Sequence, residues 1–261
     1  TQAAHILMNI LTKKENILFF ILGGFFIANA LIAEFIGVKI FSLEKTIGIA
    51  PLKYYILGQE MSFNLTAGVI LWPVVFIMTD IINEYFGKKG VRFLSFLTVG
   101  LISYAFIMVY FAIHITPADW WPSSLQQNGV PNFQLAFAKV FGQGLWIIIG
   151  SLVAFLIGQI VDVLVFQKLK QITGEKKIWL RATGSTLVSQ FIDSFVVLII
   201  AFKLGADWTW ALVIAVGINN YIYKFFIAIV LTPLIYLGHF LIDQYLGKEL
   251  ANKLKLEASN S

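Results

Sequence analysis

The chain has 261 residues, of which 59% are hydrophobic and 13% are charged. A soluble domain has about 25% charged residues and roughly half apolar ones, so this chain is too apolar and too poor in charge to be water-soluble, disordered, coiled-coil or collagen-like. Because the sequence contains no cysteine, disulfides, thiol nucleophiles and cysteine metal sites are also excluded.

Long stretches with few charges predict membrane-spanning helices, because about 20 apolar residues cross the roughly 30 Å hydrocarbon core. In chain order these stretches are residues 17–40, 63–86, 92–114, 144–167, 182–204 and 209–237. The alternating ten-residue segments of an outer-membrane barrel are absent from the sequence. The sequence therefore predicts an all-α polytopic membrane protein, with residues 1–261 forming one domain of six transmembrane helices.

The start of the first span resembles a secretory signal peptide. Lys13 and Lys14 precede an apolar run that reaches the triplet Ala-Asn-Ala at residues 28–30, a pattern typical of a signal cleavage site. Hydrophobicity resumes directly after this triplet. We therefore expect the segment to be retained as a transmembrane helix.

The basic residues predict the orientation of the helices. Thirteen Lys and Arg residues lie at the chain ends, between spans two and three, or between spans four and five, whereas five lie in the opposite connections. Cytoplasmic loops carry the excess of Lys and Arg, so both termini are expected in the cytoplasm. This also explains the net charge of +5 without a nucleic-acid partner.

The connections between spans fit the same topology. Residues 39–61 contain Tyr54 and Tyr55, and residues 115–138 contain two tryptophans, so both are expected as interfacial loops on the outer face. Residues 239–257 alternate charged residues with Leu and predict a short amphipathic helix on the inner surface.

Small residues recur every fourth position in the fourth span, at Gly150, Ala154 and Gly158. Such a stripe lets another helix approach closely. It is consistent with ordinary packing within the chain and permits a homodimer without requiring one.

Polar residues form one stripe on each of four spans. The ionisable groups in or near the spans are Glu34, Asp80, Glu84, Asp162, Asp193 and Lys224. Each costs roughly 2.5–3.5 kcal/mol at mid-bilayer on insertion scales, so they are expected to face a cavity or a partner. Helical spacing adds Thr79 and Asn83 in the second span, Gln159 in the fourth, Ser185, Thr186, Ser189 and Gln190 in the fifth, and Asn219, Asn220 and Tyr223 in the sixth. The sequence thus predicts a central polar cavity.

The depth of these groups varies along the cavity. Counted from the ends of the predicted spans, Asp80 and Asp162 lie about 10 Å or less from the inner face. Asp193 and Lys224 lie nearer the midplane, and Glu34 lies toward the outside. Acidic groups are therefore expected at several levels.

The mixture of side chains suits a flat heterocycle. A carboxylate can accept hydrogen bonds from the N1–H and 2-amino groups of a guanine-like ring, an amide can serve its carbonyl, and Trp72 or Phe76, on the second-span stripe, can stack on its face. The competing interpretation is that Asp193 and Lys224 form a structural ion pair and that the amides hold helices together. On that interpretation Trp72 is ordinary packing.

The run Thr79-Asp80-Ile81-Ile82-Asn83-Glu84-Tyr85-Phe86-Gly87-Lys88-Lys89, followed by Arg92, resembles the queuosine precursor transporter family, also called the vitamin uptake transporter family. Further segments that resemble it, in the expected order, are Gln159-x-x-Asp162, Trp179-Leu180-Arg181, Ser185-Thr186, Gln190-x-x-Asp193, Asn220-Tyr221-x-x-Lys224 and Thr232-Pro233. The resemblance covers nearly the whole chain, although Trp72 and the 115–138 loop do not map onto it. It implies a six-helix transporter of the bacterial inner membrane that imports a 7-deazaguanine base such as preQ0, preQ1 or queuine.

This interpretation gives each polar residue an expected role. The candidates for the donor edge of the ring are Asp80, Glu84, Asp162 and Asp193, and those for its acceptor are Gln159, Gln190 and Asn220. Lys224 is expected to balance the carboxylates, and Glu34 is the candidate for coupling or gating. No cofactor or metal is expected, and the expected partners are the nucleobase substrate and the lipid bilayer.

The alternative is a substrate-binding subunit of an energy-coupling-factor type vitamin importer, which also has six spans. Such subunits dock onto their partner through small residues of the first span; Ala28, Ala30 and Ala33 are present here without a clean Ala-x-x-x-Ala. The chain has no Walker motif, so ATP would have to be supplied by a partner.

A membrane enzyme is disfavoured. The sequence lacks H-E-x-x-H, G-x-S-x-G and G-x-G-x-x-G. Its three histidines, His5, His114 and His239, include no pair spaced to bind haem or zinc.

Overall fold

The computed structural model describes residues 12–174 and 177–259, so the outermost parts of the predicted domain, at 1–11 and 260–261, lie outside the described residues. Within the described part of the chain, five stretches of helix are long and apolar enough to cross a membrane. The other elements in these ranges are short strands and short helices. The prediction of an all-α protein with several membrane-length helices is confirmed.

Long helices alternate with short elements along the chain. In order, the elements are α2 (Lys14–Ile36), β1 (Ile40–Ser42), α3 (Leu43–Thr46), β2 (Tyr54–Ile56), β3 (Gln59–Met61), β4 (Asn64–Thr66), η1 (Ala67–Ile70), α4 (Trp72–His114), η2 (Gln126–Asn128), α5 (Phe133–Gly142), α6 (Leu145–Thr173), α7 (Ile178–Leu198), η3 (Ile199–Leu204), α8 (Trp210–Leu246) and α9 (Lys248–Ser259). The π-helix η3 directly continues α7.

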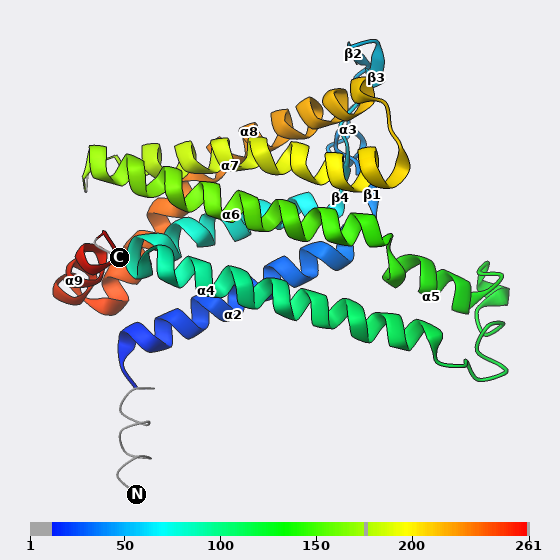
Figure 1. Ribbon diagram of the computed structural model, residues 1–261, viewed down its shortest axis with the longest axis horizontal. Helices are drawn as coiled ribbons and strands as arrows, with labels where there is room; N and C mark the ends of the chain where they lie inside the picture. Colours follow the sequence, from blue (N-terminus) through cyan, green and yellow to red (C-terminus); the bar gives the residue numbers. More distant parts are fainter. Residues whose placement is uncertain (1–11, 175–176, 260–261) are drawn as a thin grey trace, which may run out of the picture.

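The long helices lie side by side in one bundle with two distinct ends (Figure 1). The start of α2 and the whole of α9 lie at one end, which we call the terminal end. The strands, α3 and α5 lie at the opposite end, which we call the loop end. The predicted connections 39–61 and 115–138 thus lie at the same end of the bundle, and α5 and η2 show that the second of these regions is partly helical.

The helix α4 doubles back on itself at Gly87. This residue has φ 65° and ψ −175°, a conformation essentially restricted to glycine, and it separates two helical parts. In Figure 1 the part before Gly87 runs from the loop end to the terminal end, and the part after it runs back. The two parts correspond to the second and third predicted spans, so their connection is reduced to a turn at one glycine.

The helix α4 begins at Trp72, whereas the second span is predicted to begin at residue 63. The intervening residues form β4, which pairs antiparallel with β1, and the 3-10 turn η1. Pro73 lies in the first turn of α4, where its missing N–H costs no helical hydrogen bond. Hydropathy alone does not separate so short an apolar strand from the helix that follows it.

The helix α8 continues to Leu246, although the sixth span is predicted to end at residue 237. Pro233 lies inside α8, and the helix ends at Gly247, which has φ +84°. The predicted amphipathic segment 239–257 is therefore divided between the last turns of α8 and the separate helix α9. Leu250 and Leu254 of α9 pack on a cluster that includes residues of α4 and α8, which fixes α9 at the terminal end.

The main apolar core lies between α2, α4 and α6. Phe26, Ile82, Ile102 and Phe155 are among its most buried members. The small-residue stripe of α6 faces α7 and η3: a Cβ added to Gly150 would lie 3.2 Å both from the backbone oxygen of Val197 in α7 and from Ala201 Cβ in η3. This stripe therefore serves packing within the chain, and it brings α6 close enough to α7 for their polar residues to meet.

The 3-10 turn η1 packs very closely against α2, and we expect Gly68→Ala to disturb this contact. A Cβ on Gly68 would lie 2.7 Å from the backbone oxygen of Ala33. Such overpacking costs about 1–3 kcal/mol. The control is Gly24→Ala, because Gly24 has open space beside it and alanine is favoured in helices. Thermal unfolding in detergent compares the two variants, and equal midpoints would contradict the close approach.

Glu44 has a buried carboxyl group that links two segments of the loop end by hydrogen bonds. Its Oε1 accepts a hydrogen bond from the Phe63 N–H at 2.8 Å, and its Oε2 accepts one from the Ser42 hydroxyl at 3.1 Å. Burial by itself raises the pKa of Glu44, but the hydrogen bonds from Phe63 and Ser42 outweigh it and lower the pKa below the ordinary value of 4.5. The ionised carboxyl therefore stabilises the fold.

This lowered pKa makes the stability of the loop end dependent on pH. Because the pKa is lower in the folded than in the unfolded chain, the stabilisation is complete above about pH 4.5 and is lost as the pH falls through the folded value. We expect the melting midpoint of the wild type to fall more steeply in this acid range than that of Glu44→Gln. Melting curves at several pH values between about 6 and 3 provide the test; parallel slopes would contradict it.

Candidate functional site

Two carboxyl groups from different helices meet where α4, α6 and α7 pack together. Asp80 of α4 and Asp162 of α6 are both 0% exposed and lie within hydrogen-bonding reach of each other. On α7, the hydroxyls of Ser185 and Thr186 lie 3.2 and 3.1 Å from the two oxygens of Asp80. The hydroxyl of Ser189 lies 3.0 Å from Asp162 Oδ1. We call these five side chains the carboxyl seat.

Gln159 lies one helical turn before Asp162 and makes a separate polar contact with α4. Its Oε1 accepts a hydrogen bond from the Thr79 hydroxyl at 2.9 Å, and the residue is almost fully buried. Among the described residues its Nε2 has no hydrogen-bond partner, and the same is true of Asp162 Oδ2 and Gln190 Nε2. Buried polar atoms nearly always have partners, so these atoms on neighbouring turns of α6 and α7 mark a place that can receive further polar groups.

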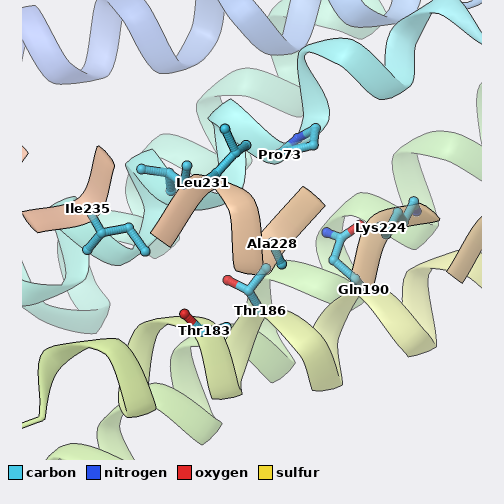
Figure 2. A pocket seen from close by; sticks show the side chains of 9 residues that line it. Pro73, Thr183, Thr186, Gln190, Lys224, Ala228, Leu231 and Ile235 are labelled. Carbon is cyan, nitrogen blue, oxygen red and sulfur yellow. The ribbon is translucent and has the colours of Figure 1, made fainter. Parts of the chain in front are cut away.

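A cavity lies beside the carboxyl seat, between the first part of α4, α7 and α8 (Figure 2). Its enclosed volume is about 20 Å³, and the empty space reaches about 350 Å³ only when the part open to its surroundings is counted. It is lined by Pro73, Ile77, Thr183, Thr186, Gln190, Lys224, Ala228, Leu231 and Ile235. In Figure 2, Gln190 and Lys224 lie toward one end of the cavity and Ile235 toward the other. Thr186 belongs to both the cavity wall and the carboxyl seat.

Asp193 and Lys224 form an ion pair between α7 and α8. Lys224 Nζ lies 2.5 Å from Asp193 Oδ2, and the two side chains are 10% and 19% exposed. Phe76 of α4 approaches the same aspartate across Gly158, because a Cβ on Gly158 would lie 3.5 Å from Phe76 Cζ and 3.6 Å from Asp193 Cβ. The structure thus brings three of the predicted site residues close together, and of these Lys224 lines the cavity.

Glu34 lies near the end of α2, toward the loop end. Its Oε2 accepts a hydrogen bond from the Ser151 hydroxyl at 3.0 Å, whereas its Oε1 has no partner among the described residues. Glu34 thus contacts α6 and is not among the residues that line the cavity.

Glu84 lies outside the cavity wall, in a buried cluster with two cations. Its Oε1 is 2.7 Å from Arg181 Nη2 and 3.4 Å from Lys170 Nζ, and Glu84 and Arg181 are both 0% exposed. Arg181 also donates to the carbonyl of Gly174 at 2.6 Å and stacks over the ring of Phe166. Arg181 and Lys170 count as loop charges in the orientation argument, yet both are buried.

Two predicted residues lie apart from the carboxyl seat. The centroid of the Trp72 ring lies 5.6 Å from that of Phe155, so Trp72 packs against the apolar core. Asn220 is half-buried on α8. Its neighbour Asn219 is tied to the loop end, since its Oδ1 accepts a hydrogen bond from the Tyr54 hydroxyl, whose pKa is raised by burial and by the charge of Glu44.

Several residues of the site have no role assigned to them in the sequence analysis. Ser185, Thr186 and Ser189 belong to the predicted polar stripe of the fifth span, and their helical spacing is the signal that could have indicated a role. Thr183 lies one turn before Thr186 in the same helix and lines the cavity. Arg181 carries no such signal, because its position at a predicted span end is typical of an exposed basic residue.

Comparison with known proteins gives a consistent result. Residues 66–238 match the family model described as "Putative vitamin uptake transporter". The chain is 32% identical to a "Probable queuosine precursor transporter" of Bacillus subtilis over 183 residues, which are 67% of this chain and 72% of that protein. It is 30% identical to a protein of the same description from Haemophilus influenzae, over 67% of this chain and 68% of that one. The "Queuosine precursor transporter" of Escherichia coli is 29% identical over 56% of this chain and 59% of its own. No solved structure matches.

A bundle of membrane-length helices around buried polar groups is the architecture expected of a membrane transporter, and the family match makes the protein a transporter and not an enzyme. The matched residues make up well over half of the chain, and the chain belongs to the vitamin uptake transporter family. The resemblance inferred from the sequence motifs, and the prediction of a transporter, are thereby confirmed.

Proposed function

We propose that this protein imports a queuosine precursor, a 7-deazaguanine base such as preQ0, preQ1 or queuine, through the cavity between α4, α7 and α8. The names of the three relatives support this substrate class. The cavity supports it through its chemistry, because amide, hydroxyl and charged groups at one end and apolar side chains at the other suit a flat ring with polar edges.

The observation that carries the proposal is the unpaired amide of Gln190 in the cavity wall. In the proposed complex Gln190 Nε2 donates to the ring carbonyl, and Asp193 accepts from the donor edge of the ring. Phe76, which approaches Asp193, provides an aromatic surface close to this edge. Lys224 forms an ion pair with Asp193 and thereby orients its carboxylate.

The proposed topology is six crossings of a bacterial inner membrane, with the two parts of α4 counted separately and both termini in the cytoplasm. The doubling back at Gly87 and the shared end of α2 and α9 support six crossings (Figure 1). The excess of Lys and Arg at that end supports a cytoplasmic location of both termini. The bacterial origin of the relatives supports the assignment to a bacterial membrane.

The proposal predicts a ligand-induced thermal shift. We expect one of preQ0, preQ1 and queuine to raise the melting temperature of the protein in detergent, and guanine to have a smaller effect. A ligand at 100 times its Kd that binds only the folded state stabilises it by about 2.7 kcal/mol. Gln190→Leu is expected to abolish the shift, whereas Gln126→Leu, at an exposed position of η2, is expected to retain it.

The outcomes separate the two candidate functions. A shift with a deazaguanine, together with uptake by this chain alone in liposomes, would exclude a vitamin-importer subunit that needs an ATP-hydrolysing partner. A folded sample that responds to none of the three bases would contradict the proposed substrate class.

A further inference from the structure

We infer that the Asp80–Asp162 pair of the carboxyl seat is a proton-binding site and that proton entry through it drives the import of the base. The inference rests on the proposed function, because it concerns the energy source of that transport. In one cycle, one proton passes from the outer solution to a carboxyl oxygen of the pair and then to the cytoplasm, and one molecule of base crosses in the same direction.

Two buried acids are in contact in the carboxyl seat. Asp80 and Asp162 reach each other across the α4–α6 interface, and neither has any exposed surface. Two adjacent carboxylates repel each other, and removal of each from water costs several kcal/mol. A single proton held between them removes one charge and supplies a hydrogen bond, as in other paired carboxyl groups.

The carboxyl seat has few hydrogen-bond donors. Three hydroxyls, those of Ser185, Thr186 and Ser189, serve the two carboxyl groups. Each hydroxyl has one proton, and those of Ser185 and Ser189 also lie 3.0 and 3.1 Å from a backbone carbonyl of their own helix. Two ionised carboxylates would therefore lack donors, and Asp162 Oδ2 is indeed without a partner among the described residues. A proton on the pair satisfies this oxygen.

The buried charged groups around the seat are engaged elsewhere. On the elements packed around it, the buried Glu, Lys, Arg and His side chains are Glu34 on α2, Glu84 on α4, Lys170 on α6, Arg181 on α7, Lys224 and His239 on α8, and Lys255 on α9, and the half-buried Asp193 and Asp243 lie on α7 and α8. Arg181 and Lys170 contact Glu84, Lys224 contacts Asp193, and Lys255 contacts Asp243. Among the described residues no Lys or Arg forms an ion pair with Asp80 or Asp162.

The carboxyl seat is connected to the cavity. Thr186 contacts Asp80 and lines the cavity, one turn before the unpaired Gln190. A base that engages this part of α7 therefore alters the surroundings of the proton. Two ligands bound to one helix segment influence each other's affinity reciprocally, which is the requirement for coupled transport.

The test uses the full chain reconstituted in liposomes that contain a trapped pH indicator, with radiolabelled preQ0 as the probe. Exchange of external label against internal unlabelled preQ0 first establishes transport without any gradient. We then expect an outside-acid gradient of one pH unit to raise the accumulation of preQ0 by up to about tenfold at zero membrane potential, for one proton per base. We also expect addition of external preQ0 to acidify the lumen.

Variants then assign the effect to the pair. In Asp80→Asn and Asp162→Asn, whatever uptake remains is expected to be independent of the pH gradient and to leave the lumen pH unchanged. The control is Asp207→Asn, because Asp207 is exposed beyond the end of α7 and should behave as the wild type does.

Each outcome is decisive. If the wild type exchanges preQ0 but neither accumulates it along a pH gradient nor acidifies the lumen, the proton site is wrong while the proposed function stands. Gradient-dependent uptake in both variants would likewise overturn the assignment. If the wild type does not exchange any of the three deazaguanines, the proposed function fails, and this inference fails with it. The wild-type measurement decides even if the variants do not fold.

Discussion

Glu84→Gln is expected to destabilise the folded protein by about 3–5 kcal/mol, because it removes the anion from a buried charge cluster and leaves two cations behind. Arg181 Nη2 and Lys170 Nζ both contact Glu84 Oε1, and the three side chains are at most 4% exposed. Arg181→Met is expected to cost less, about 1–3 kcal/mol, because Glu84 keeps Lys170 as a partner and only hydrogen bonds are lost. Glu84→Gln should therefore lower the free energy of unfolding more than Arg181→Met does.

Thermal unfolding of purified protein in detergent measures both effects. The matched control is Glu257→Gln, which breaks an exposed ion pair between Glu257 and Lys253, separated by 3.9 Å, and should leave the midpoint unchanged. A midpoint for Glu84→Gln equal to that of the wild type would show that the cluster does not support the fold. An effect of Arg181→Met larger than that of Glu84→Gln would contradict the charge argument.

The sequence predicts the long helices well because their signal is strong. About 20 consecutive apolar residues leave little alternative to a membrane-length helix. The ends of these helices are less predictable, since they depend on local strand pairing and on how each helix accommodates proline. Pairing of β4 with β1 removes the expected first turns of α4, and α8 passes through Pro233 because a helix can tolerate proline when neighbouring groups compensate.

The site is predictable where residues share a helix face and unpredictable where the partner comes from another helix. Spacing on one helix aligns Gln159 with Asp162, and in the structure both side chains are buried and hydrogen-bonded to neighbouring helices. Spacing carries no information on which residue faces Glu84 across the bundle. Arg181 is therefore taken for a surface charge, although it is buried against Glu84. Prediction of such a pair requires the tertiary arrangement of α4 and α7.

Asp193→Asn is expected to weaken binding of the preferred deazaguanine roughly 10- to 150-fold, because it removes the charged hydrogen-bond acceptor that is paired with Lys224 of the cavity wall. A carboxylate accepts two donors of the ring edge, whereas an amide offers one acceptor oxygen. Lys224 lies 2.5 Å from Asp193 Oδ2, and it loses its counter-charge in the same variant. The affinity is measured by equilibrium binding of labelled base to the detergent-solubilised protein.

The double variant Asp193→Asn/Lys224→Gln distinguishes a binding role from a structural one. If the ion pair only holds α7 to α8, the single variant is destabilised by the unpaired Lys224, and neutralising both partners restores both the melting midpoint and the affinity. If Asp193 contacts the base, the double variant recovers the midpoint but not the affinity, since the acceptor is still missing. We expect the second result. Recovery of both quantities would assign Asp193 to packing and leave the unpaired amide of Gln190 as the principal ring contact in the cavity wall.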